Sequence, residues 1–273
     1  MKEETKGSYV LGHCSNEHRR LMLQSRFIGE LTESLFVRSG LTKGMNVLDA
    51  GCGAGDVSIL AAAFVGPSGN VLGLDQSADS IALARERTKS AGLSNVRFEV
   101  DVLENLKHRG PFDALVGRLV LLYLQEPAAI LRKMAELVRP GGLIVFQEME
   151  MATGRSIPEV PLYTQCGQWI VRAFERAGVE TSMGSRLYAI YKQAGLPAPQ
   201  MIGGGRVEGG SQSEIYEWVA QTVRSLLPMI EKTGVATKDE VDVDTLADRL
   251  RKDVTGKGGV IHSPIFVGAW ARK

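Results

Sequence analysis

The chain has 273 residues and a formal net charge of +1, from 32 lysines and arginines against 31 aspartates and glutamates. This length is enough for one large domain, or for one domain with a cap. The balanced charge and the lack of basic runs give no electrostatic reason to expect a nucleic-acid partner. No apolar stretch approaches the roughly 18 residues that a membrane span needs, so we expect no membrane partner either.

The cysteines and the first residues of the chain bear on the cellular compartment of the protein and on metal binding. Cys14, Cys52 and Cys166 are too few and too scattered for a disulfide framework. Cys14 and His18 have ligand-like spacing, but no second pair does, so we predict no metal. The charged residues 1–6 lack the apolar segment of a signal peptide. We expect a soluble, cytoplasmic protein, and a homodimer stays open.

In chain order, residues 8–38 carry apolar side chains at helical spacing and predict an N-terminal helical segment. Apolar strands and helices then alternate. We expect strands at 45–49, 70–74, 96–100, 112–117 and 142–148, and helices near 56–65, 77–91 and 127–138. Such alternation predicts a parallel sheet with helices on both faces. Ligands of these sheets bind beyond the carboxyl ends of the strands.

The second half of the chain departs from this alternation. The segments 151–185 and 211–256 have helical patterns and are expected to form a cap over the carboxyl edge of the sheet. Between them, 186–194 predicts the helix before a sixth strand at 200–208. Residues 259–271 predict a seventh strand.

The most specific pattern is Val47–Gly55, where a strand passes through Asp49 into glycines at alternate positions. Glycines let a ligand lie against the backbone, and the helix that follows offers free N–H groups to an anionic group. A dinucleotide loop of the form G-x-G-x-x-G would need its third glycine where this chain has Asp56. The match to dinucleotide enzymes therefore fails at that position.

Acidic residues also follow three successive predicted strands. Asp49, Asp75 and Asp101 occupy these strand ends. Asp75 alone would suit either class of ligand, because a carboxylate can accept from both hydroxyls of a ribose. The set of three suits a ligand with an ammonium group, a ribose and an adenine amine, and S-adenosylmethionine has all three.

Four segments, 49–55, 74–76, 100–102 and 137–142, together resemble the ordered motifs of class I S-adenosylmethionine-dependent methyltransferases. The small-molecule branch is the most similar, meaning ubiquinone/menaquinone-type and secondary-metabolite enzymes. The resemblance implies an α/β fold: a Rossmann-like seven-stranded methyltransferase sheet with an antiparallel last strand, helices on both faces and a helical cap. It also implies S-adenosylmethionine as the cofactor. We expect an N-terminal helical lid at 1–38 and the methyltransferase domain, with its cap insertions, at 39–273.

The resemblance assigns positions for the methionine end of the cofactor. Gly51, Gly53 and Gly55 would line this portion, and Asp49 would reach its ammonium group through the loop or a water. Arg118, after the fourth strand, would bind the carboxylate of the cofactor, since a buried arginine needs a partner. An ion pair within the scaffold is the alternative for Arg118.

Further positions would contact the adenosine part. Asp75 would bind the ribose diol, with a helix cap as its alternative role, and Gln76 would lie beside the adenine or face solvent. Asp101 would accept from the adenine amine while the backbone of Val102 contacts the ring. Tyr9 resembles an aromatic residue that closes over the cofactor in some bacterial secondary-metabolite enzymes.

Methyl transfer from a sulfonium is an in-line displacement, so positioning and exclusion of water can supply most of the rate. A base matters only when the acceptor arrives protonated with a high pKa. Glu148, at the end of the fifth strand, His13 and Arg118 are the candidate catalytic residues. His18 and His262 are weaker candidates, because lone histidines more often pack or face solvent.

The function we expect is methyl transfer to a small, fairly apolar organic molecule, with O- or C-methylation favoured over N-methylation. Residues 116–122 lack the Asn/Asp-Pro-Pro-Tyr/Phe pattern of enzymes that methylate amino groups of nucleic acids and proteins. Arsenic methylation would need a set of reactive cysteines that this chain does not supply. Two alternatives stay open: a cyclisation or elimination on the same fold, and a tRNA or protein methyltransferase, which would call for a basic face.

Overall fold

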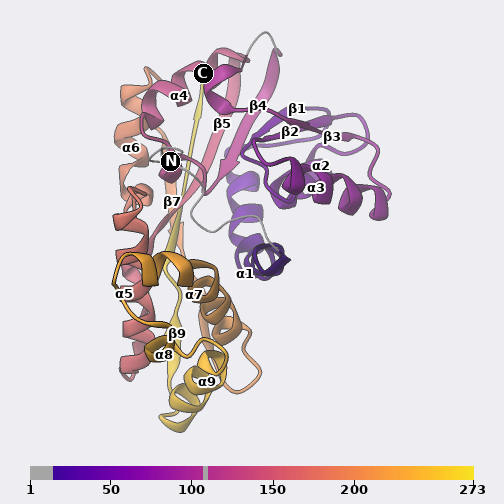
Figure 1. Ribbon diagram of the computed structural model, residues 1–273. Coiled ribbons are helices and arrows are strands. Elements are labelled where there is room, and N and C mark those ends of the chain that lie inside the picture. Colours follow the sequence, from indigo (N-terminus) through magenta and orange to yellow (C-terminus); the bar gives the residue numbers. More distant parts are fainter. Residues whose placement is uncertain (1–14, 107–109) are drawn as a thin grey trace, which may run out of the picture. The chain divides into compact units, whose positions relative to one another are not determined.

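The computed structural model describes residues 15–106 and 110–273, which divide into two compact units (Figure 1). The sheet unit comprises residues 29–148, 184–203 and 267–273. The helical unit comprises residues 149–183 and 204–266, together with the described residues up to Ile28. Each unit has its own secondary structure and its own core.

Within the described residues, the sheet unit is built on a seven-stranded sheet in the order β3-β2-β1-β4-β5-β10-β7. Its strands are β1 (Asn46–Ala50), β2 (Asn70–Asp75), β3 (Val96–Val100), β4 (Phe112–Arg118), β5 (Val138–Glu150), β7 (Gln200–Gly204) and β10 (Ile265–Arg272). Strands β1 to β5 pair in parallel and the last strands are antiparallel. The predicted α/β fold and its antiparallel last strand are confirmed.

Helices connect the parallel strands as the alternation predicts. They are α2 (Asp56–Val65), α3 (Ala78–Ser90) and α4 (Pro127–Glu136), while α6 (Met183–Gln193) precedes β7. Two short 3-10 turns are η1 (Leu103–Asn105) and η2 (Leu121–Tyr123). Helix α3 begins at a capping serine, because the Ser77 hydroxyl accepts from the backbone N–H of Ser80 at 3.2 Å. Gly92, with φ of 67°, follows the end of this helix.

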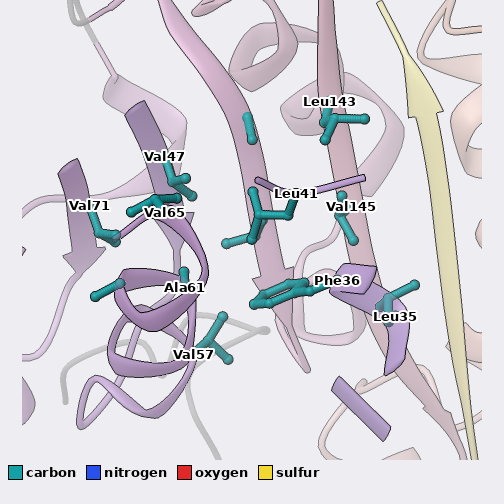
Figure 2. Packing of buried hydrophobic residues seen from close by; sticks show 13 residues of the cluster. Leu35, Phe36, Leu41, Val47, Val57, Ala61, Val65, Val71, Leu143 and Val145 are labelled. Carbon is teal, nitrogen blue, oxygen red and sulfur yellow. The ribbon is translucent and has the colours of Figure 1, made fainter. Parts of the chain in front are cut away.

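Helix α1 (Ser15–Ser39) begins in the helical unit and continues beyond Ile28 in the sheet unit. Its second half is part of the core: Leu35 and Phe36 are buried in one cluster with residues of α2 and the sheet (Figure 2). Thr32, also on this half, donates to Gln147 Oε1 on β5 at 2.7 Å. The lid predicted at 1–38 can therefore involve only residues before Gly29, where it stays a prediction.

The helical unit contains α5 (Pro161–Arg176), α7 (Ile215–Lys232), α8 (Lys238–Val241) and α9 (Leu246–Gly256), after a short turn η3 (Met151–Thr153). Helix α7 packs against α5 and α9. A small sheet completes the unit: β9 (Val260–His262) pairs antiparallel with β6 (Arg155–Ile157) and with β8 (Val207–Gly209). The segments expected as a cap lie in this unit, and their covering of the sheet edge stays a prediction.

Both strands expected in the last third of the chain are interrupted, which corrects the sequence-based boundaries. The segment 200–208 divides into β7 and β8, and 259–271 divides into β9 and β10. Pro264 lies at the second break and has no N–H to donate to a ladder. The Ser263 hydroxyl instead accepts from the backbone N–H of Arg206 at 2.9 Å, which joins the two breaks.

Close packing between β4 and β5 gives a test of the sheet unit. A Cβ on Gly117 would lie 2.4 Å from Cε1 of Phe146, a fully buried residue. We expect Gly117→Ala to lower the free energy of unfolding, measured by urea denaturation, by about 1–3 kcal/mol through overpacking. Gly29→Ala, in a helix with no neighbour within 4 Å of the new Cβ, should raise it by about 0.5–1 kcal/mol. Equal stabilities of the two variants would contradict this packing.

Candidate functional site

The loop between β1 and α2 presents one open backbone position. Gly51 and Gly53 have φ of 66° and 51°, a region that side chains rarely adopt. A Cβ on Gly51 would lie 2.6 Å from Cγ2 of Val120, so this glycine allows the loop and the turn after β4 to approach closely. A Cβ on Gly53 would meet no atom within 4 Å. Gly53 is therefore where a ligand can lie against the backbone.

Gly55, the third glycine of the motif, has a different role. It precedes α2 as its N-cap residue with φ of 84°. A Cβ there would lie 3.0 Å from Cζ of Phe98 and 3.1 Å from Cβ of Ala84. The chain thus uses Gly55 for close packing between the loop and the neighbouring elements.

Asp49, beneath the loop, is a fully buried carboxylate with one unsatisfied oxygen. Its Oδ2 accepts from the hydroxyl of Ser58 at 2.6 Å, and Oδ1 has no partner among the described residues. Burial raises the pKa of Asp49 to about 7. The Ser58 hydrogen bond and the positive charge of Arg118 oppose this rise, while the charges of Asp75 and Asp56 add to it. The site therefore holds an acid that titrates near neutral pH.

Asp75 joins the glycine loop to the start of α3. Its Oδ2 accepts from the backbone N–H of Gly53 at 2.9 Å, and its Oδ1 accepts from that of Ser77 at 2.9 Å. Each carboxylate oxygen retains a second lone pair for a ligand hydroxyl. The cap of α3 is Ser77 itself, so Asp75 supports the cap but does not replace it. Gln76 is exposed between them.

Asp101 follows β3 and lies beside Asp75. The backbone N–H of Asp101 donates to the carbonyl oxygen of Asp75 at 3.0 Å. Its side-chain Oδ1 accepts from the backbone N–H of Val102 at 2.9 Å, so this N–H already has a partner. The structure thus brings Asp49, Gly53, Asp75 and Asp101 together at the ends of β1, β2 and β3.

Arg118 ends β4, and the turn that follows it contacts Glu148. Arg118 Nη1 donates to Thr32 Oγ1 on α1 at 3.2 Å. Burial lowers the pKa of Arg118, while the charges of Asp56 and Asp49 raise it. The next residue, Leu119, has a φ of 56°, a strained conformation for a residue with a side chain.

Glu148 holds this strained turn in place. The side chain is fully buried, and Oε1 accepts from the N–H groups of Val120 and Leu121 at 3.0 and 2.8 Å. Its Oε2 has no partner among the described residues. Burial raises the pKa of Glu148 to about 8 against the opposing backbone hydrogen bonds. The catalytic role expected for Glu148 stays a prediction, and the contacts of its side chain fix Val120 near Gly51.

The other predicted candidates lie elsewhere. His262 is on β9 of the helical unit, and its carbonyl oxygen accepts from the Tyr163 hydroxyl at 3.0 Å. Tyr9, His13 and Cys14 lie outside the described residues, as does the side chain of His18. The described ranges contain no group of three His, Cys, Asp or Glu residues that could hold a metal ion. In the same ranges, no helix has the length and apolar character needed to cross a membrane.

Sequence reasoning missed three residues that shape the site. Ser58 bonds the buried carboxylate of Asp49, Thr32 links Arg118 to Gln147, and Val120 packs against Gly51. Ser58 could have been found, because a serine in the first turn of the helix after the loop faces back toward the strand end. Thr32 and Val120 carry no such local signal, since their partners are distant in sequence.

Comparisons with known proteins agree with this fold. A family model described as a methyltransferase domain matches residues 41–195, more than half of the chain. The chain is 36% identical over 113 residues to the ubiquinone biosynthesis O-methyltransferase of Sodalis glossinidius, covering 41% of this chain and 44% of that protein. It is 32% identical over 121 residues to the arsenite methyltransferase of Aquipseudomonas alcaligenes, covering 41% of this chain and 35% of that protein. The chain thus spans less than half the length of these relatives.

A solved structure is similar over most of the chain. The putative methyltransferase of Bacillus halodurans has a TM-score of 0.59 and 16% sequence identity, and the match covers 88% of this chain and 97% of that chain. At this identity the likeness concerns the fold alone.

The raised pKa of Glu148 predicts that stability falls as the pH rises. The ordinary pKa is 4.5 and the folded value is about 8, so between these values the unfolded chain binds fewer protons and each rise in pH favours unfolding. The pKa of Asp49 rises from 3.8 to about 7, so this residue also makes the stability fall as the pH rises between these two values. Glu148→Gln keeps an acceptor for both N–H groups but cannot ionise. We expect its free energy of unfolding, from urea denaturation between about pH 5 and pH 8, to decline less steeply than that of the parent chain.

Asp113→Asn is the matched control for this measurement. The N–H of Asn46 and the guanidinium of Arg139 hold the pKa of Asp113 below its ordinary value of 3.8. Asp113 therefore stays ionised throughout the measured window, and its replacement should leave the pH slope unchanged. A Glu148→Gln variant with the parent slope would show that Glu148 is not protonated in the folded protein.

Proposed function

Because the chain belongs to the methyltransferase domain family, we propose that it transfers a methyl group from S-adenosylmethionine to a small organic acceptor that is largely apolar. The observation that carries this proposal is the buried carboxylate of Asp49, whose Oδ1 has no partner among the described residues. Leaving a buried charged oxygen unpaired is costly. The ammonium group of a bound S-adenosylmethionine would offset that cost.

Other residues of the sheet unit fit the same cofactor. Gly53 offers open backbone for the methionine portion. Asp75 has lone pairs left for ribose hydroxyls, and Asp101 lies beside it. When bound, S-adenosylmethionine supplies a methyl group on a positively charged sulfur. The work left to the protein is to hold the acceptor in line and to exclude water.

A general base is not required by this proposal. Glu148, with a pKa of about 8, is protonated at neutral pH and could accept a proton only at higher pH. We propose that it acts by holding the turn at Val120 and Leu121, whose N–H groups it accepts from. His13 remains a candidate base from the sequence alone.

A sequence motif and the state of the cysteines also bear on the class of methyl acceptor that we propose. O- or C-methylation is favoured over N-methylation because residues 116–122 lack the Asn/Asp-Pro-Pro-Tyr/Phe pattern of amino-methylating enzymes.

Among the described residues, Cys52 and Cys166 are buried in separate units. Burial raises the pKa of both thiols, that of Cys166 to about 12. Thiols that stay protonated are poor ligands for soft ions, which argues against arsenite as the acceptor.

Calorimetric binding of S-adenosylhomocysteine tests the cofactor assignment directly. Asp75→Ala should weaken binding by about 1.5–3 kcal/mol, because it removes a charged acceptor and the bond to Gly53. Asp101→Asn should weaken it less, since the amide oxygen can still accept. Asp79→Ala, an exposed residue in the first turn of α3, is the control and should bind like the parent chain. Lack of binding by the parent chain, or of S-adenosylhomocysteine production with a metabolite library, would refute the proposed function.

Proton release on binding tests the role of Asp49. At a pH near 7, about half of its carboxyl groups are protonated, and an ammonium group would favour ionisation. The charged groups that act on Asp49 are Arg118, Asp75 and Asp56. We expect release of about half a proton per S-adenosylhomocysteine bound, seen as a binding enthalpy that differs between phosphate and Tris buffers. Asp49→Asn should abolish the difference, and equal enthalpies in the parent chain would contradict this role.

A further inference from the structure

Helix α7 of the helical unit carries three buried polar atoms that no described residue satisfies. They are Trp218 Nε1, Gln221 Oε1 and Ser225 Oγ. Trp218 is 6% exposed and Gln221 is 8% exposed. Residues three and four positions apart share one face of a helix, so the three atoms form a row, here called the polar row of α7. Buried polar groups are nearly always paired, and three on one face point to a ligand.

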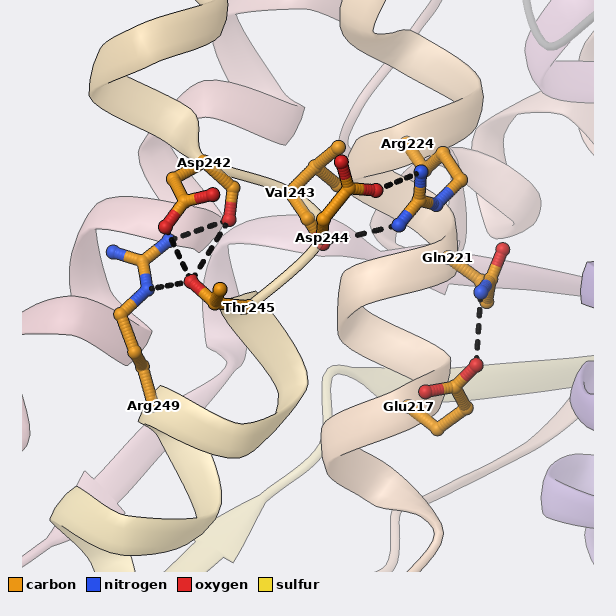
Figure 3. Close-up of polar contacts among 8 residues, drawn as sticks. All are labelled: Glu217, Gln221, Arg224, Asp242, Val243, Asp244, Thr245 and Arg249. Atoms are coloured by element: carbon orange, nitrogen blue, oxygen red, sulfur yellow. Dashed lines mark hydrogen bonds and ion pairs between the residues drawn. The ribbon is translucent and has the colours of Figure 1, made fainter.

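The polar row is distinct from the apolar row of α7. Ile215, Val223 and Leu226 form a fully buried apolar row elsewhere on the helix. On another side, Arg224 pairs with Asp244 at 2.7 Å and donates to the carbonyl oxygen of Val243 (Figure 3). Neither set of contacts supplies a partner for the three atoms of the polar row.

Neighbouring contacts fix the orientation of two of these groups. Gln221 Nε2 donates to Glu217 Oε1 at 2.8 Å, and the amide oxygen points away from this carboxylate (Figure 3). An ionised carboxylate only accepts, so the amide cannot be reversed. The ring of Trp218 stacks on Phe27 with centroids 4.7 Å apart and planes 14° apart. The row therefore offers one N–H donor, one carbonyl acceptor and one hydroxyl that can do either.

We propose that the polar row of α7 binds a small molecule through neutral hydroxyl groups. A hydroxyl can accept from Trp218 and donate to Gln221, whereas a carboxylate or phosphate cannot donate to Gln221 Oε1. The nearby guanidinium of Arg206 is paired with Glu208 at 2.6 Å, so it does not favour an anion. An ammonium group could not accept from the indole N–H.

The stacked rings of Trp218, a member of the row, and of Phe27 indicate the shape of the rest of the ligand. Phe27 and Trp218 are both buried and stacked, and the guanidinium carbon of Arg206 lies 5.0 Å from the centre of the Phe27 ring. Such a rigid aromatic wall favours a flat, apolar body. The ligand class is therefore a hydroxylated, otherwise apolar small molecule.

Three naphthalene probes test this assignment on the full chain saturated with S-adenosylhomocysteine. 2-Naphthol donates and accepts, 2-methoxynaphthalene only accepts, and 2-naphthoate is an anion. Dissociation constants come from ligand-observed NMR titration. We expect 2-naphthol to bind about tenfold more tightly than either of the others, the scale of one or two lost hydrogen bonds.

Two variants should remove this preference and a third should keep it. Trp218→Phe deletes the N–H and keeps an aromatic ring, and Gln221→Met deletes the amide with little change in volume. Thr222→Val is the matched control on the same helix, because the Thr222 hydroxyl is already bonded to the carbonyl oxygen of Trp218 at 2.8 Å. Loss of the 2-naphthol preference in the first two variants and its retention in the control would support the proposal.

A second measurement needs no ligand. Ser225→Ala removes an unpaired hydroxyl and should leave the melting temperature unchanged or raise it. Ser263→Ala leaves the N–H of Arg206 without its acceptor and should lower the melting temperature. If Ser225→Ala were as destabilising as Ser263→Ala, the Ser225 hydroxyl would be bonded in the free protein and the proposal would be overturned.

Calorimetric binding of S-adenosylhomocysteine to the same proteins separates the two proposals. If it binds but the parent chain shows no preference for 2-naphthol, or both variants retain that preference, the polar row does not recognise hydroxyl groups and only this inference fails. If S-adenosylhomocysteine does not bind, the proposed function fails, and the probe titrations are then repeated without it to test this inference.

Discussion

The turn after β4 is the constraint on which the site geometry depends. Leu119 adopts a left-handed conformation there, and Glu148 accepts from the next two backbone N–H groups. This places Val120 so close to Gly51 that a side chain at position 51 would collide with it. The glycine loop is therefore confined from one side by Val120 and tied from the other by Asp75, which accepts from Gly53. A preorganised loop of this kind loses little entropy when a ligand binds.

Two buried carboxylates with raised pKa values serve this arrangement in different ways. Glu148 meets backbone N–H groups, so its raised pKa reflects burial within the scaffold. Asp49 is on the strand that leads into the glycine loop, and a cation beside it would favour its ionised form. Strained residues and buried polar groups without a partner often gather at functional sites, where a ligand supplies the missing hydrogen bond or charge. By that criterion, Asp49 in the sheet unit and the polar row of α7 in the helical unit are comparable features.

Local signals explain which parts of the structure could be predicted. The first three strands and the glycine loop depend on short apolar runs and turn residues, and they agree with the sequence-based boundaries to within a residue or two. The breaks at 205–206 and 263–264 were missed because apolar residues stand on both sides of each, although the glycines at 203–205 and Pro264 indicated an interruption. The polar row was missed because Gln221 and Ser225 on a helix are normally read as a solvated face. Only the three-dimensional structure shows that these atoms are buried.

The small sheet of the helical unit has a consequence for the order in which the protein can fold during synthesis. Its central strand, β9, is made about a hundred residues after its partner β6. The large sheet has a similar feature, because β10 is inserted between β5 and β7 although it is synthesised after both. Neither unit can complete its hydrogen-bond ladder until the ribosome has translated the region of β9 and β10. The nascent chain must therefore carry unpaired edges on β5 and β6 until β9 and β10 are translated, a state in which chaperones commonly protect proteins from aggregation.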